Sequence, residues 1–399
     1  MEVTNATIPA VNGLTARWAG VVSDGTVFSA AGVWPLLGFL ADGAGGAARA
    51  ELAEAVGCPA EEAAYRAREF MATLGAMRGF DSALGLWTDE RLKAREEWES
   101  GLSAGTRGAL TGAHDADHAT LDAWATERTG GLIERMPVDL TDETMLVLAS
   151  ALALRTKWLR PFEERFFRPE AGPWQGRALL GLRRRSVLLD RIGVADTPHG
   201  SVTELKVLGS TGIDVHLLLG EERMSPGQVL GAGVDLLGGT REVVPGPLLP
   251  YGDVGPGVRV AKERCVRPRP TTLRVMTAAY EVRAEHDLLE RSALFGLTAA
   301  SDRGRGHFPG ICAWPPLAVE SARQCAMAKF GALGFRAAAV TSIGIGVTSA
   351  PERHHVTTTI DAVFDRPFGF LAVHRPTRLV LAAGWVTDPE PYREDQGSY

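Results

Sequence analysis

Two histidines four positions apart are the first residues that could bind a metal. His114 and His118 enclose Asp115 and Asp117 in the sequence. On a helix, residues four apart share one face, so both imidazoles could reach the same ion together with a carboxylate. The spacing makes a metal site one hypothesis for this stretch.

A second group of titratable residues lies near the C-terminus. His354, His355 and Asp361 could act in acid–base catalysis or sense pH, because an imidazole titrates near neutral pH. No nucleophile elbow, P-loop or dinucleotide fingerprint accompanies them, and the stretch 209–212, Gly-Ser-Thr-Gly, predicts a turn. We therefore predict no cofactor, and keep the three residues as catalytic candidates.

The aromatic composition indicates a further kind of site. The chain has 9 Trp against 5 Tyr, an unusual ratio. Most of these side chains are expected in the core, but some could line an apolar pocket. The candidates for such a pocket are Trp18, Trp34, Trp87, Trp98 and Trp314.

The composition excludes several classes of protein. The 399 residues are 45% hydrophobic and 23% charged, which excludes a disordered chain. A formal net charge of -6 argues against binding to nucleic acid or to an anionic membrane. The arginines at 183–185 and at 264, 267 and 269 are predicted to be a solvated face.

The termini and cysteines indicate the compartment. The longest apolar stretch, residues 145–154, is too short to cross a bilayer, and residues 1–20 do not resemble a secretion signal. We therefore predict a cytoplasmic protein. The 4 cysteines, Cys58, Cys265, Cys312 and Cys325, lack metal-like spacing and are predicted to be buried free thiols.

Helices predominate early in the chain, and strands predominate after residue 200. Helical spacing of apolar residues predicts helices over 30–57, 61–77, 90–102, 121–135 and 287–295. Short apolar or alternating runs predict strands over 145–154, 202–207, 213–219, 258–261, 356–360, 370–374 and 379–386. This distribution is typical of an α+β fold.

Six segments in order along the chain resemble the serpin family. They are Phe28-Ser29 with residues 36–45; Trp124, Thr129, Gly131 and Ile133; residues 146–158 with Pro161-Phe162; 287–311; 334–341; and 365–368 with 381–389. Each match is weak alone, and their common order carries the resemblance. Asp117-His118 stands near a strand start where the family has an Asp-Phe pair, so we predict no metal.

The resemblance implies one domain over residues 1–399. Its fold would have a large central β-sheet, two smaller sheets and about eight to nine helices. It also implies a reactive-centre-loop region over 332–364, which a protease cleaves and which then enters the central sheet as an extra strand. Inward-facing hinge residues must then be small, because a strand alternates its side chains between two faces.

The resemblance assigns roles to individual residues of this region. The hinge would comprise Ala332, Gly334, Phe335, Arg336, Ala337, Ala338, Ala339 and Thr341. The exposed part of the loop would comprise Gly346, Val347, Thr348, Ser349 and Arg353. Counting from the hinge places the scissile bond at Thr348-Ser349, and the longer loop makes Arg353-His354 an alternative that suits a trypsin-like protease.

The hinge departs from the family pattern. A Glu–Lys pair of the family falls on Ala332 and Ala279, so both charges are absent. The first inward hinge residue is Phe335, followed by Arg336, where the family has a small hydroxyl residue and Glu. We expect burial of Phe335 to overpack the sheet at a cost of about 1–3 kcal/mol.

The region that controls opening of the sheet departs as well. The family has a polar cluster there, and this chain retains Ser29 but has Gly32, Ser150 and Gln324 at the other positions. Gln324 and Ser150 could preserve a polar network with different partners. Trp158 belongs to the matching motif beneath the insertion point.

These departures predict a non-inhibitory, intracellular serpin-fold protein. It would bind or transform a small apolar molecule, for example as a cofactor-independent natural-product cyclisation or rearrangement catalyst, because such a site needs shape and few polar groups. The alternative is an inhibitor of a serine or cysteine protease, and a third reading is a chaperone or structural serpin. The sequence leaves the oligomeric state open.

Overall fold

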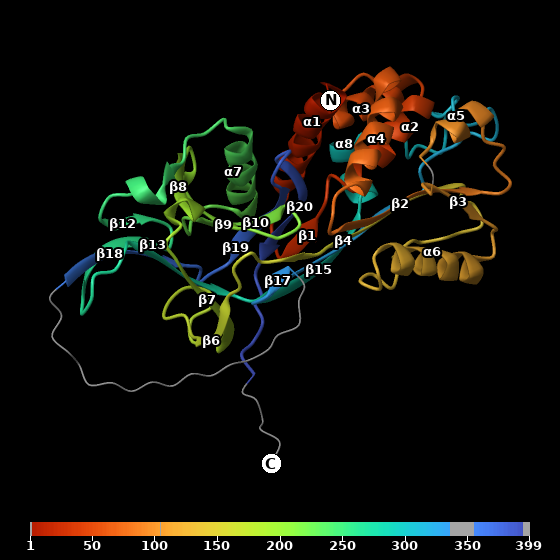
Figure 1. Ribbon diagram of the computed structural model, residues 1–399. Coiled ribbons are helices and arrows are strands. Elements are labelled where there is room, and N and C mark those ends of the chain that lie inside the picture. Colours follow the sequence, from red (N-terminus) through yellow and green to blue (C-terminus); the bar gives the residue numbers. More distant parts are fainter. Residues whose placement is uncertain (1, 104, 336–354, 394–399) are drawn as a thin grey trace, which may run out of the picture.

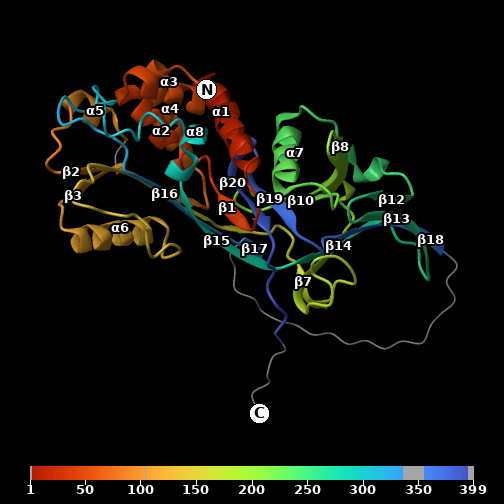
Figure 2. The ribbon, with the colours of Figure 1, turned by 180° about the vertical axis from the view of Figure 1, so that it is seen from behind.

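The computed structural model describes residues 2–103, 105–335 and 355–393. These residues form eight α-helices and twenty strands in three sheets, which confirms the α+β serpin-type architecture. Helices α1 to α4 gather on one side of the central sheet, and α6 lies on its other side (Figures 1 and 2).

The central sheet has two parallel strands at its middle. Strands β4 (Leu146–Leu154) and β16 (Ser321–Phe330) pair directly, from Val147 opposite Ser321 to Ala153 opposite Met327. We call this junction the seam. Strands β2 (Phe80–Asp89) and β3 (Arg107–Leu110) extend the sheet beyond β4, and β15 (Tyr280–Asp287) extends it beyond β16. The apolar run 145–154 is thus a strand buried on both faces, as predicted.

The second sheet is antiparallel and forms much of the core. Its order is β1 (Thr26–Phe28), β20 (Leu379–Val386), β19 (Phe368–His374), β10 (Ile213–Gly220), β9 (Gly200–Val207), β8 (Ile192–Thr197) and β11 (Val244–Pro245). The third sheet runs β12 (Gly252–Gly255), β13 (Val258–Cys265), β18 (His355–Val363), β14 (Thr272–Ala278), β7 (Leu179–Ser186) and β6 (Glu163–Phe167).

The helices differ from the predicted ranges where glycine or tertiary contacts intervene. They are α1 (Glu2–Ala19), α2 (Trp34–Gly43), α3 (Gly46–Val56), α4 (Ala60–Gly75), α5 (Glu96–Gly101), α6 (His114–Arg128), α7 (Pro226–Gly238) and α8 (Ser292–Phe295). The helices predicted over 30–57 are α2 and α3, separated by the extended residues Ala44 and Gly45. The predicted helix 287–295 is shorter than expected, because Asp287 ends β15; residues 289–291 form a 3-10 helix and 292–295 the α-helix α8.

Two unequal apolar clusters lie on opposite faces of the central sheet. The larger one joins the inner face of this sheet to the second sheet and to α1–α4. The smaller one lies under α6 and includes Leu121 and Ala125 of that helix and Trp87 of β2. Among the described residues, no helix is long and apolar enough to span a membrane.

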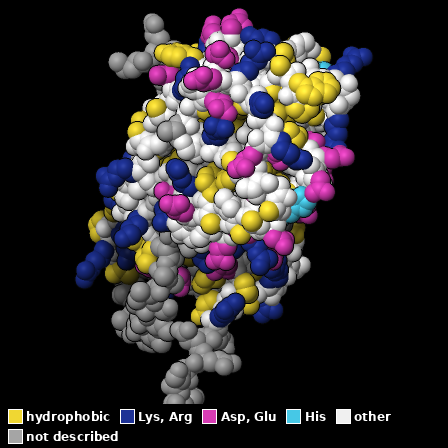
Figure 3. Space-filling model, turned by 90° about the vertical axis from the view of Figure 1, so that its right-hand side faces the viewer, with side chains coloured by type: hydrophobic (Ala, Val, Ile, Leu, Met, Phe, Trp, Pro, Cys, Tyr) yellow, Lys and Arg dark blue, Asp and Glu magenta, His cyan; other side chains and the backbone are white. Residues whose placement is uncertain are grey.

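Four of the five candidate tryptophans pack in the core. None of the described cavities is an apolar pocket lined by them, contrary to the prediction. Trp18, Trp34, Trp87 and Trp98 are buried, whereas Trp314 is 77% exposed. Only Trp18 borders a described cavity, a small one whose other walls include charged side chains. The four cysteines are buried and unpaired, as predicted. Positive and negative side chains alternate over the face seen in Figure 3, without a single-sign field there.

Candidate functional site

The predicted hinge begins beyond the end of the seam at Ala153 and Met327, which we call its upper end. After β16 the chain turns back at residues 331–334 and forms the short strand β17 (Gly334–Phe335). Phe335 pairs with Phe330 of β16 on one side and with Thr156 of β5 (Thr156–Lys157) on the other. Phe335 therefore occupies the first position of a strand between β4 and β16.

Phe335 is buried against aromatic rings of other strands, and the overpacking expected of it stays a prediction. Its side chain is 1% exposed, and its ring lies 6.2 Å from that of Phe370. Phe370 is tilted against Tyr280 at 5.2 Å, and Tyr280 stacks on Phe330 at 5.3 Å. The hollow that receives Phe335 thus belongs to an aromatic cluster contributed by four different strands.

The positions of the family's Glu–Lys pair are apolar and buried. Ala332 and Ala279 are 7% and 1% exposed and belong to the same apolar cluster as Phe335. An unpaired charge at either position would be costly in such surroundings. Loss of both charges together is therefore consistent with a well-packed upper end of the seam.

An ion pair that the sequence analysis did not predict joins β15 and β16. Lys329 of β16 lies directly opposite Glu281 of β15, with its Nζ 2.9 Å from Glu281 Oε2 and 3.4 Å from Glu390 Oε1. The hydrogen bond from Lys329 lowers the pKa of Glu281, and the same bond raises the pKa of Lys329. The signal in the sequence is opposite charges at positions that β15–β16 pairing brings face to face.

Trp158 fixes the turn that precedes Phe335. Its indole Nε1 donates to the carbonyl of Gly331 at 2.8 Å, and its backbone N–H donates to Leu333 at 3.0 Å. The backbone N–H of Phe162 donates to Ala332 at 2.8 Å. The segment 158–162 therefore holds residues 331–333 by three hydrogen bonds.

The predicted sheet-opening residues form a complete polar network beneath the seam. Gln324 Oε1 accepts from the Ser29 backbone N–H at 2.8 Å, while its Nε2 donates to the Ser29 carbonyl at 2.9 Å and to Ser150 Oγ at 3.3 Å. Ser29 Oγ donates to Leu381 and accepts from the Gly32 N–H. Gln324 thus bonds to both Ser29 and Ser150, as the preserved-network interpretation requires.

Glycine at position 32 follows from this network. A Cβ on Gly32 would lie 2.9 Å from Ser150 Oγ and 3.3 Å from Gln324 Nε2. The space for a side chain at residue 32 is therefore filled by the hydroxyl of Ser150 and the amide of Gln324.

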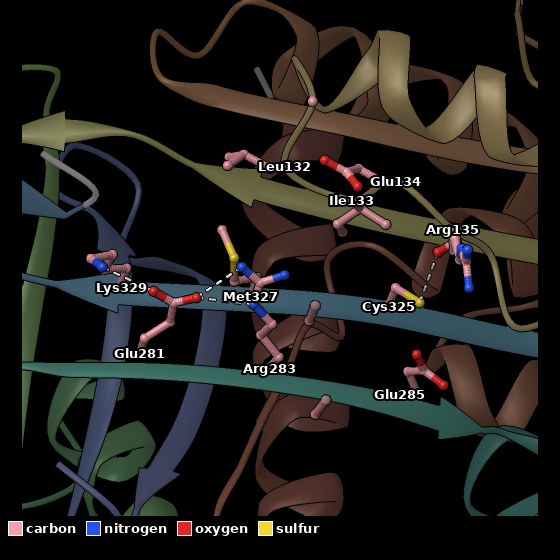
Figure 4. A pocket seen from close by; sticks show the side chains of 13 residues that line it. Leu132, Ile133, Glu134, Arg135, Glu281, Arg283, Glu285, Cys325, Met327 and Lys329 are labelled. Carbon is pink, nitrogen blue, oxygen red and sulfur yellow. Dashed lines mark hydrogen bonds and ion pairs between the residues drawn. The ribbon is translucent and has the colours of Figure 1, made fainter. Parts of the chain in front are cut away.

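The outer face of β15 and β16 carries the largest described cavity, a groove of about 920 Å³ (Figure 4). Cys325 and Met327 form its floor, and residues 131–135, which follow α6, form one wall. Glu281, Arg283 and Lys329 line the opposite side. The groove is therefore of mixed charge, which suits a polar ligand and not the apolar one predicted.

The segment after α6 also covers the upper end of the seam. Leu132 forms a small apolar cluster with Ala153 and Met327, the last residue pair of the seam. All three side chains are buried. Separation of β4 and β16 at this level would expose Ala153 and Met327.

Comparisons with known proteins agree with this geometry. A sequence model of the family described as Serpin (serine protease inhibitor) matches residues 17–171. Putative serpin-Z6C of Oryza sativa subsp. japonica is 24% identical over 394 residues, which cover 91% of this chain and 90% of the relative.

Solved structures extend the likeness over the whole chain. Thyroxine-binding globulin in complex with thyroxine has a TM-score of 0.72 at 16% identity, covering 98% of this chain and 100% of that chain. The thermophilic serpin tengpin in its native state has a TM-score of 0.72 at 14% identity, covering 97% and 94%. A serpin from the trematode Schistosoma haematobium has a TM-score of 0.70 at 14% identity, covering 96% and 100%.

The chain has the serpin fold, and its sequence resembles that family over residues 17–171. Most of the predicted hinge and loop lies outside the described residues. This applies to Arg336, Ala337, Ala338, Ala339, Thr341, Gly346, Val347, Thr348, Ser349, Arg353 and His354. The roles of Ala332, Gly334 and Phe335, whose positions are described, stay predictions.

The catalytic candidates in β18 do not form a site. His355 and Asp361 are six residues apart on one strand, which separates them by about 20 Å at roughly 3.3 Å per residue. Asp361 accepts hydrogen bonds from Arg274 at 2.6 and 2.9 Å, and His355 is exposed. No shared reaction can use both side chains.

The spacing of His114 and His118 also has a structural explanation. The carboxylate of Asp117, between them, accepts hydrogen bonds from the backbone N–H groups of Thr111 and Gly112 and thereby fixes the start of α6. His114 Nε2 lies 3.3 Å from Asp142 Oδ1. In the described part of the chain, no group of three or more metal-binding side chains converges.

Proposed function

We propose that this chain inhibits a protease by loop insertion, and not that it is the non-inhibitory protein its hinge sequence predicts. The observation that carries the proposal is the position of Phe335. Its backbone pairs with β16 on one side and with β5, which follows β4 in the chain, on the other, and its side chain belongs to the inner core. A cleaved strand would continue downward from Phe335 between β4 and β16.

The sequence after Phe335 supports the same proposal. Because side chains of a strand alternate between faces, every second residue after Phe335 would point into the core. These residues are Ala337, Ala339, Thr341, Ile343, Ile345 and Val347, while Ser342, Gly344 and Gly346 fall between them. Burial of each larger apolar side chain contributes about 1.5–3 kcal/mol, which supplies a driving force for insertion.

Two departures that argued against inhibition carry less weight in the folded chain. The polar network beneath the seam is satisfied through Gln324, and Lys329 with Glu281 joins β15 to β16 near the hinge. Between β4 and β16, both of which the structure describes in full, the only side-chain hydrogen bond is the one from Gln324 to Ser150. These contacts support the proposal that other residues take over the control of sheet opening at the same positions.

Limited proteolysis tests the proposal. Trypsin is the first probe, because Arg353 is a candidate cleavage site; the cut is mapped by mass spectrometry and melting is followed by circular dichroism. Insertion predicts a rise in melting temperature of about 10 °C or more, since several buried side chains are gained at once. A protease that is inhibited should also form an SDS-stable complex with the cut chain.

A matched pair of variants sharpens the result. Thr341→Arg places a charge at an inward position and should abolish the rise after cleavage, whereas Ser342→Arg, at an outward position, should retain it. An unchanged melting temperature after clean cleavage of the wild-type chain would contradict loop insertion.

The second candidate function is binding of a small polar molecule. It is favoured by the groove over β15 and β16, whose wall carries Glu281, Arg283 and Lys329. A neighbour in structure, thyroxine-binding globulin, is solved in complex with thyroxine, so the same fold supports ligand binding in that protein. A catalytic version of this function lacks support, because Glu281 and Lys329 in the groove pair with each other at 2.9 Å, which lowers the pKa of Glu281 and raises that of Lys329. Unchanged melting after cleavage would favour this second function.

A further inference from the structure

A second cavity, of about 370 Å³, lies on the third sheet, far from the groove. One face of this sheet carries Glu263 and Cys265 of β13, Thr357 and Thr359 of β18, and Arg274 of β14, and all of them line the cavity. Arg185 of β7, opposite Arg274, lines it as well. Arg264, between Glu263 and Cys265 in β13, also lines the cavity, as do Val266 and Arg269 of the segment that follows this strand.

The charges around this cavity are unequal. Arg274 is neutralised, because its Nε lies 2.6 Å from Asp361 Oδ1 and its NH1 lies 3.1 Å from Glu263 Oε2. Among the described residues, no carboxylate lies within 4 Å of the guanidinium of Arg185, Arg264 or Arg269. Three of the arginines that line the cavity therefore lack a paired carboxylate in the described part of the chain.

Two threonines fix the backbone that carries Arg269. Thr357 Oγ1 of β18 donates to the carbonyl of Arg269 at 2.9 Å, and Thr272 Oγ1 donates to the carbonyl of Pro270 at 2.9 Å. The loop between β13 and β14 is thus tied to β18 at the position of the arginine. A fixed backbone reduces the entropy that a cationic side chain loses when it binds a ligand.

We propose that this cavity binds a small molecule that carries a tetrahedral oxyanion, a phosphate or a sulfate. A guanidinium offers paired N–H donors that match the oxygens of such a group, and three of them flank one cavity. The volume falls in the range of small-molecule sites. Cys265 at the buried side of the cavity would lie next to the bound molecule.

Binding is tested by thermal shift and calorimetry on the full chain. The probes are inorganic phosphate, sulfate, glucose 6-phosphate and glucose 6-sulfate, with glucose and sodium chloride at matched ionic strength as controls. We expect saturable stabilisation by the phosphate or sulfate ester and none by glucose. A preference for one ester identifies the group, and equal binding of both identifies a general oxyanion site.

Exposed arginines provide matched variants that leave the fold intact. Arg264→Gln and Arg269→Gln should each weaken binding by about tenfold or more, since each removes a charge-assisted contact. Arg267→Gln is the control, because Arg267 lies in the same segment but does not line the cavity. The bound ester should also slow alkylation of Cys265 in the wild-type chain, as followed by peptide mass spectrometry.

The proposal fails if no probe gives a saturable response. It also fails if Arg267→Gln weakens binding as much as Arg264→Gln and Arg269→Gln, because a diffuse surface charge would then explain the effect. Stabilisation that matches sodium chloride at equal ionic strength would overturn it as well.

Discussion

At the scale of residues, the polar network beneath the seam shows how the side chain at one position limits the side chain at another. Ser150 and Gln324 fill the space that a side chain at position 32 would need, and Gln324 bonds to both Ser29 and Ser150. The family resemblance located these positions in the sequence. It could not predict the bonds, because they depend on distances between residues almost 300 positions apart.

Replacement of Gln324 tests the network. Gln324→Leu keeps the volume but leaves the buried Ser29 N–H without a partner and removes one of the two hydrogen bonds to the Ser29 carbonyl, which also accepts from the Gly32 N–H. We therefore expect a loss of about 1–3 kcal/mol in the free energy of unfolding. Ser150→Ala removes a single bond of 3.3 Å and should cost about 1 kcal/mol or less. Urea denaturation measures both, and equal effects of the two variants would contradict a central role for Gln324.

A buried carboxylate gives this protein a specific acid sensitivity. Burial alone would raise the pKa of Glu204, but the hydrogen bond with His216 at 2.7 Å and the charge of Lys206 outweigh it and lower the pKa. Because the pKa of Glu204 is lower in the folded state, its ionised form stabilises the folded protein at pH values above the ordinary Glu pKa, near 4.5. This stabilisation disappears as the pH falls through the pKa that Glu204 has in the folded state.

Glu204→Gln isolates that contribution. The variant should be less stable than the wild type at pH 7, and the difference should shrink as the pH falls below about 4.5. Urea midpoints across this range measure the difference. A gap between the two proteins that stays constant down to pH 3 would contradict the assignment.

At the scale of elements, strand β17 matters most, although it has only two residues. The sequence indicated the strands around it well, since 202–207 and 213–219 lie within observed strands and 145–154 begins one residue before β4. It could not indicate the hollow that receives Phe335, because this hollow is made by Tyr280, Phe330 and Phe370 on three other strands. Periodicity within one segment contains no information about such a hollow.

Truncation of Phe335 measures what this strand contributes. Phe335→Ala removes a fully buried ring and should destabilise the uncleaved chain by about 3–5 kcal/mol. Leu333→Ala, in the preceding turn, is the control with a smaller expected loss, because Leu333 is only half-buried. Thermal and urea unfolding compare the two, and a negligible effect of Phe335→Ala would show that the strand is not seated in the core.

At the scale of the whole molecule, one sheet separates two apolar cores of unequal size. The larger core unites the inner face of the central sheet with the second sheet and the helices around α1. The smaller lies between the outer face and α6. Helix and strand order along the chain predicted the α+β class, but neither composition nor periodicity could indicate that the sheet would divide the core.

Because α6 packs only on the smaller core, its stability differs from that of the main core. Only Asp117, Leu121 and Ala125 of the helix are buried, with the ring of Trp124 set edge-on to Trp87 at 5.5 Å. We expect a helix with so few buried residues to detach at a free energy below that of global unfolding, while the main core remains folded. Such a local opening would uncover the outer side of the seam.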